Sequence, residues 1–161
     1  MRRSKDLDEN AVRLAVRELA QQGLQAVVID LDHRSQIAEA TRLHREHPVW
    51  REGCDTVTLA ALAEQSKLNI GIDSGPGKAF AAVATPGIIC WRGLHPLHYH
   101  GLSDCLHLVP ADHARHLFGG NAAAGLAYFR QHYWYHELQG NLCQELPAAI
   151  RRELAEPRSA A

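Results

Sequence analysis

The chain has 161 residues, which fits one domain, and its hydrophobic (46%) and charged (22%) fractions are those of an ordinary globular protein. Its 17 Lys and Arg and 18 Asp and Glu residues leave a net charge of −1 with neutral histidines, which argues against bulk attraction to nucleic acid or anionic membranes. No apolar run is long enough to span a bilayer, and the four scattered cysteines include no C-x-x-C pair. We therefore expect a cytoplasmic protein without a disulfide framework.

Helical and strand patterns alternate along the first two thirds of the chain. Apolar residues at helical spacing predict helices over residues 10–22 and 56–66. A polar helix is expected over 34–46, and a helix of small residues over 76–84. Short apolar runs predict five strands, over residues 25–31, 49–50, 68–72, 87–91 and 105–109. Such alternation indicates an α/β fold with a mainly parallel sheet flanked by helices.

The ends of the predicted helices carry capping signals. The first helix is expected to begin at Asp8 or Asn10 and to stop at Gly23. The third is expected to begin at Asp55 or Thr56.

Beyond residue 110 the pattern becomes helical, with helices predicted over 121–138 and 142–154 that pack on the sheet or on a partner. The predicted elements divide the chain into a tail at residues 1–8, a single Rossmann-like domain over 9–155 and a second tail at 156–161. Within the domain, residues 9–110 form the α/β core and 111–155 a C-terminal helical extension.

The segment most informative about function is I-G-I-D-S-G-P-G-K, at residues 70–78. A buried strand ends there, a turn of small residues follows, and a helix starts at Pro76. Backbone N–H groups at a helix start, a serine hydroxyl and a lysine can together hold a phosphate. The competing interpretation is a plain strand-to-helix turn, because short glycine motifs often carry no function. The candidate phosphate-binding residues are Asp73, Ser74, Gly75, Pro76, Gly77 and Lys78.

The wider region 56–96 resembles glycosyltransferase family 9, the heptosyltransferase-like enzymes. That family shows D-S-G-P-x-H after a strand, an alanine-rich helix, a T-P turn into a strand, and F-G-P-T-x-P. The present chain has D-S-G-P-G-K, A-F-A-A-V-A-T-P-G-I-I and W-R-G-L-H-P in this order. The resemblance covers about residues 8–110 and implies the C-terminal, donor-binding half of a GT-B fold. It implies a nucleotide-diphospho-sugar as ligand, with no cofactor required.

The chain also departs from the family pattern. Lys78 stands where the family has histidine, and the family's opening strand is not evident before residue 8. The family's N-terminal acceptor domain, which supplies the catalytic base, has no counterpart here, so no catalytic residue is assigned. The resemblance implies a nucleotide edge at Asp32, Arg34, Cys54, Asp55 and Thr56. It implies an acceptor-side loop at Arg92, Gly93 and His95.

Eleven histidines are an unusual number for this length. H-P-L-H-Y-H offers His98 and His100 as weak metal candidates, but no Cys or Asp at zinc spacing accompanies them, and solvated or acceptor-facing side chains are the favoured interpretation. His132 and His136, four residues apart on the predicted helix 121–138, are interpreted as a surface or interface stripe.

The function expected from this resemblance is donor binding in an inverting, metal-independent transfer of a hexosyl or heptosyl group. The expected partners are the nucleotide sugar and either a separate acceptor-domain chain or a second copy. The alternative is a degenerate, non-catalytic glycosyltransferase-like module that acts in a protein complex.

Overall fold

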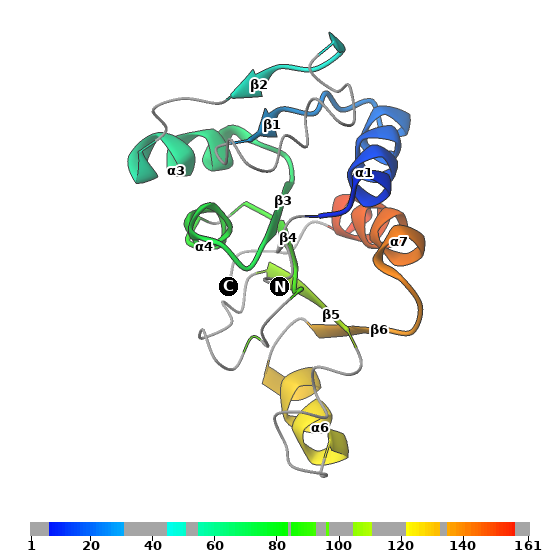
Figure 1. The fold of residues 1–161 in the computed structure, drawn as a ribbon. Coiled ribbons are helices and arrows are strands. Elements are labelled where there is room, and N and C mark those ends of the chain that lie inside the picture. Colours follow the sequence, from blue (N-terminus) through cyan, green and yellow to red (C-terminus); the bar gives the residue numbers. More distant parts are fainter. Residues whose placement is uncertain are drawn as a thin grey trace, which may run out of the picture.

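The computed structural model describes residues 7–30, 45–50, 55–83, 85–92, 96, 105–110, 122–132 and 135–156. Helices and strands alternate along most of them (Figure 1). The helices are α1 (Glu9–Gln21), α3 (Thr56–Gln65), α4 (Gly75–Ala81), α6 (Ala122–His132) and α7 (Leu142–Ala155). The strands are β1 (Val28–Ile29), β2 (Val49–Trp50), β3 (Asn69–Ile72), β4 (Gly87–Cys90), β5 (Cys105–Pro110) and β6 (Tyr135–Leu138).

All strand pairs are parallel. Strands β3, β4, β5 and β6 form one sheet in that order, and β1 and β2 form a separate pair. Parallel neighbours require a crossover between them, and α4 is such a crossover, from β3 to β4. α3 connects β2 of the smaller sheet to β3 of the larger one. The predicted class, a Rossmann-like parallel α/β sheet flanked by helices and followed by a C-terminal helix, is confirmed.

The sheet is covered on both faces (Figure 1). On one face, Ile88 of β4 and Leu108 of β5 pack against Leu146 and Ile150 of α7 and Ala11 of α1. The opposite face of the same strands contacts α4, and α3 lies beside α4. Strands covered on both faces need near-continuous apolar sequence, and β4 is buried along its whole length.

The predicted capping residues are found at the helix ends. The Asp8 carboxylate accepts the Ala11 N–H at 2.8 Å and begins α1, and the Asp55 carboxylate accepts the Thr58 N–H at 2.7 Å and begins α3. Gly23 follows Gln22, the C-cap of α1, and has φ of 72°, a conformation in which a side chain is strained.

Two predicted elements differ from the structure. The helix predicted over 121–138 ends at His132, and residues 135–138 form β6, because Tyr135 and His136 pair with β5. The aromatic residue in this segment favours a strand, and pairing with β5 prevails over local helical spacing. The strand predicted over 25–31 is limited to Val28–Ile29, and Val27 is 53% exposed, so it is not buried on both faces.

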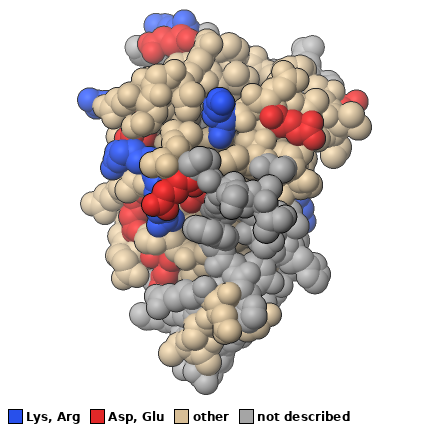
Figure 2. Space-filling view, turned by 180° about the vertical axis from the view of Figure 1, so that it is seen from behind, with Lys and Arg blue, Asp and Glu red and all other residues tan. Residues whose placement is uncertain are grey.

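The region beyond residue 110 therefore contributes a strand as well as helices. β6 completes the larger sheet, and α7 packs on it together with α1. The helix predicted over 34–46 falls largely outside the described residues. On the face in Figure 2, basic and acidic side chains are interspersed, in line with the near-zero net charge.

Candidate functional site

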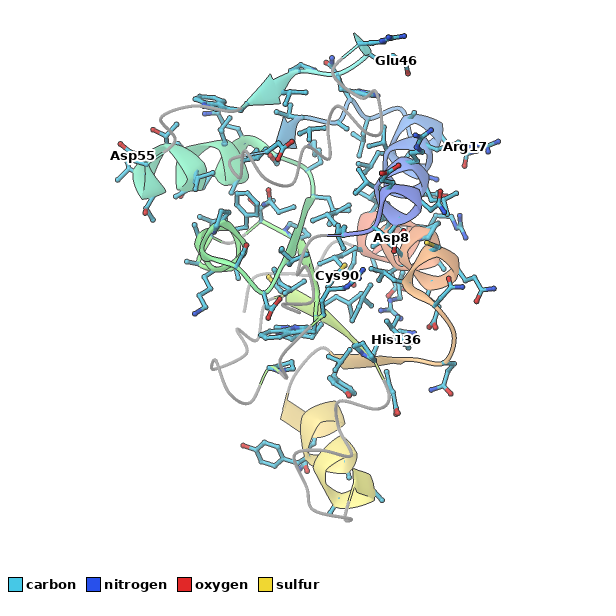
Figure 3. The ribbon with its side chains drawn as sticks, viewed as in Figure 1. Asp8, Arg17, Glu46, Asp55, Cys90 and His136 are labelled. Carbon is cyan, nitrogen blue, oxygen red and sulfur yellow. The ribbon has the colours of Figure 1, made fainter. Side chains whose placement is uncertain are left out.

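Several helices begin at the carboxyl edge of the sheet. α4 follows β3 directly, and α7 follows β6 after a three-residue connection. α1 runs parallel to α7, because Asp8 contacts Cys143 at the start of the two helices and Glu18 contacts Arg151 further along both. Figure 3 shows Asp8 at this end of α1, beside α7. The positive ends of three helix dipoles thus share one edge, where open α/β sheets bind ligands.

The turn from β3 into α4 is a tight, capped turn. The Ser74 N–H donates to the Ile72 carbonyl at 2.7 Å, and the Ser74 hydroxyl oxygen accepts the Gly77 N–H at 3.3 Å. Pro76 has no N–H, so the Gly75 N–H is the remaining backbone donor of this first turn. Gly75 is exposed, with open space where a Cβ would stand. The donors of this turn that face an anion at the carboxyl edge are the Ser74 hydroxyl and the Gly75 N–H, and the exposed Lys78 adds a positive charge on the first turn of α4.

Gly77 has a packing role in this turn. A Cβ at this position would stand 2.1 Å from the Ile72 carbonyl oxygen. A Cβ on Gly71 would stand 3.4 Å from the Gly77 Cα, so α4 lies against β3 backbone to backbone. Gly77 is buried, and it therefore sets the position of Ser74 and Lys78 against the sheet.

Asp73, the residue after β3, is only 9% exposed. Beside it, the sheet carries a buried polar pair that the sequence interpretation missed, Trp91 and His107. Trp91, directly after β4, donates its indole N–H to Nδ1 of His107 at 3.0 Å. An indole can only donate, so Nδ1 accepts and the neutral His107 carries its proton on Nε2. The signal available in the sequence was a histidine in the middle of the apolar run C-L-H-L-V-P.

Arg92 forms an ion pair with Asp8, at the start of α1. Its Nη1 lies 3.6 Å from Oδ2 of Asp8, in a half-exposed ion pair. The same Asp8 carboxylate accepts the Cys143 thiol at 3.3 Å. Burial and this carboxylate together raise the pKa of Cys143. Arg92 thus contacts the start of α1, whereas Lys78 lies on α4 on the opposite face.

Of the residues expected at the nucleotide edge, two are described. Asp55 caps α3, and its hydrogen bond with Thr58 lowers the pKa of the carboxyl group. Thr56 is exposed in the first turn of α3. Asp55 lies at the outer end of α3 (Figure 3), and its described contact is the cap alone. The other expected site residues lie outside the described residues: Asp32, Arg34, Cys54, Gly93, His95, His98 and His100.

The histidine pair expected on one helix does not form. His132 ends α6, whereas His136 lies on β6 and its Nε2 is 2.6 Å from Oε2 of Glu145. Burial acts to raise the pKa of Glu145, but hydrogen bonds from the Gly140 N–H and His136 hold it below its ordinary value. This cluster connects β6 to the start of α7.

No family model, curated protein or solved structure matches the chain. The resemblance to glycosyltransferase family 9 therefore stays a prediction. Within the described ranges, no three His, Cys, Asp or Glu side chains are arranged to hold a metal ion. None of the helices among those residues has the length and apolar character needed to cross a membrane.

Proposed function

We propose that this chain is a donor-binding domain of the glycosyltransferase kind, which binds a nucleotide-diphospho-sugar at the β3–α4 turn. The observation that carries the proposal is that the half-buried Ser74 and the exposed Gly75 and Lys78 lie together at the carboxyl edge, on a helix start fixed against β3 by Gly77. The choice of a nucleotide-diphospho-sugar as the ligand comes from the resemblance of residues 56–96 to glycosyltransferase family 9.

The proposed chemistry is electrostatic. The Ser74 hydroxyl and Gly75 N–H donate to diphosphate oxygens, and Lys78 supplies a full positive charge. These groups would stabilise the nucleoside diphosphate as it leaves the sugar. The resemblance implies an inverting, metal-independent transfer, in which an acceptor domain provides the base; the contribution of this chain is binding of the leaving group.

Calorimetric titration with ADP-, GDP-, UDP- and dTDP-sugars tests the proposal. We expect at least one of them to bind to the folded chain, and no binding to any would contradict the proposal. Ser74→Asp should weaken binding about tenfold or more, because aspartate keeps the helix cap but repels the diphosphate. Ser74→Asn is the matched control, since it keeps the cap without adding charge. Equal affinities of these two variants would place the ligand away from this turn.

The second candidate function is a non-catalytic module in a protein complex. It is favoured by the division of the described strands into two sheets, because among these strands β1 and β3 each pair with one neighbour only. Size-exclusion chromatography with light scattering discriminates between the candidates, because a stable monomer that binds nucleotide sugars favours the first.

A further inference from the structure

Arg92 is a basic residue at the carboxyl edge that the proposed diphosphate site does not use. Strands β3 and β4 are paired as far as Ile72 and Cys90. Beyond this pair the two chains leave the sheet side by side, one into the Ser74 turn and the other into Trp91 and Arg92. Neighbouring strands lie about 4.8 Å apart. Arg92 therefore leaves the sheet next to the proposed diphosphate site.

The backbone from which Arg92 extends is fixed by Trp91. The Trp91 N–H donates to the Leu108 carbonyl at 2.9 Å, which continues the pairing of β4 with β5. The Trp91 indole donates to His107 at 3.0 Å, and the Trp91 side chain is buried. A buried residue held by both its backbone and its ring has little freedom to move. Arg92 thus begins from a fixed point at the carboxyl edge.

The ion pair of Arg92 with Asp8 is loose. Nη1 of Arg92 lies 3.6 Å from Oδ2 of Asp8, which is longer than a hydrogen bond, and the two side chains are 33% and 45% exposed. Exposed ion pairs of this kind contribute little to stability. The other oxygen of Asp8, Oδ1, accepts the Ala11 N–H at 2.8 Å, so the cap of α1 holds Asp8 without Arg92. The guanidinium can therefore bind a ligand while the helix cap stays intact.

The Arg92 guanidinium has a second edge for binding. It carries five N–H donors in one plane, and the ion pair with Asp8 uses Nη1. Nε and Nη2 form an edge whose two parallel N–H bonds match the two oxygens of a carboxylate. Such hydrogen bonds are about 2.7–2.9 Å long, which is shorter than the separation from Asp8. A ligand carboxylate would therefore interact with Arg92 more strongly than Asp8 does.

The sugar is the part of the proposed ligand that lies on the Arg92 side. Lys78 lies on the α4 face of the sheet, and the Arg92 guanidinium lies on the α1 face, so a ligand that contacts both crosses the edge of the sheet. The chains that carry Ser74 and Arg92 are separated by about one strand spacing, 4.8 Å. A hexose ring joined to the terminal phosphate bridges a spacing of this size, whereas the nucleoside is joined to the other phosphate.

We propose that Arg92 determines donor specificity by binding a carboxylate on the donor sugar. The substrate class is then a nucleotide-diphospho-hexuronate, in which the sugar carries its carboxylate at C6. This inference rests on the proposed function of the β3–α4 turn. It adds to that function a second charged group of the ligand and the residue that selects it.

Titration calorimetry with matched ligands tests the inference. For the nucleotide that binds among ADP, GDP, UDP and dTDP, the diphospho-glucose and the diphospho-glucuronate differ only at C6. The glucuronate should bind the wild-type chain at least about tenfold more tightly, the scale of a charge-assisted bidentate pair. Equal affinities for the two sugars would overturn the inference and leave the proposed function standing. No binding of any nucleotide would overturn the proposed function and this inference together.

Arg92→Gln removes the charge and the fork of donors. We expect this variant to lose the preference for the glucuronate, while its affinity for the diphospho-glucose stays within about threefold of wild type. Arg17→Gln is the matched control, because Arg17 is an exposed arginine of α1 that points outward (Figure 3). It should keep the preference. A preference that persists in Arg92→Gln, or an equal loss of affinity for both sugars, would overturn the inference.

Discussion

Gly77 and Ile72 are in direct backbone contact: a Cβ at position 77 would stand 2.1 Å from the Ile72 carbonyl oxygen. Backbone is the neighbour least able to move, so this contact fixes where α4 starts. Gly75, two residues earlier in the same helix, has nothing within 4 Å of its Cβ position. The two glycines of the turn thus have different physical roles.

Gly77→Ala should lower the free energy of unfolding by about 1–3 kcal/mol, because the added methyl group forces α4 away from β3. Gly75→Ala should leave stability unchanged or raise it by up to about 1 kcal/mol, as alanine favours a helix over glycine. Urea unfolding of both variants measures the difference. Equal effects would contradict the assigned packing role of Gly77.

Glu145→Gln should reduce stability by about 1–2 kcal/mol at pH 7, since it removes the charge from the hydrogen bonds with His136 and Gly140. The folded-state pKa of Glu145 is below its ordinary value of 4.5, so its contribution is present above that value and disappears as pH falls through the lower folded-state pKa. Urea unfolding at pH 7 and pH 3 should show the difference between variant and wild type shrinking. Glu64→Gln, on the exposed surface of α3, is the control. A pH-independent difference would contradict this explanation.

Asp8→Asn should make Cys143 more reactive toward a thiol reagent at pH 8, by roughly threefold or more. The carboxylate at 3.3 Å disfavours the thiolate, and asparagine removes its charge while still capping α1. Cys143→Ser identifies the signal that belongs to this thiol. Cys90 should stay unreactive in every folded variant, because burial raises the pKa of its thiol to about 12. An unchanged rate for Cys143 would show that burial alone controls it.

Short sequence signals predicted the features that depend on interactions between residues close in the chain. Asp8, Asp55 and Gly23 mark helix ends through their own hydrogen bonds or backbone conformation, and the structure has them there. The apolar run of β4 predicted a doubly covered strand, as observed.

Contacts between distant residues could not be predicted in the same way. β6 forms because Tyr135 pairs beside His107, 28 residues earlier, and helical spacing alone did not reveal it. The ion pair of Arg92 with Asp8 and the division of the strands into two sheets also depend on non-local packing. For the candidate site, Ser74 and Lys78 could be selected from the sequence, but the packing role of Gly77 required coordinates.

The most direct test of the proposed diphosphate site compares Lys78→Ala with Lys67→Ala, which removes an exposed lysine just before the opposite end of β3. Titration calorimetry with ADP, GDP, UDP and dTDP measures their affinities. For the nucleotide that binds, Lys78→Ala should weaken binding by about 1.5–3 kcal/mol, the scale of a charge-assisted hydrogen bond, and the loss should shrink at high salt. Lys67→Ala should bind like wild type. Equal affinities of the two variants, or no binding of any nucleotide to the folded wild-type chain, would contradict the proposed site.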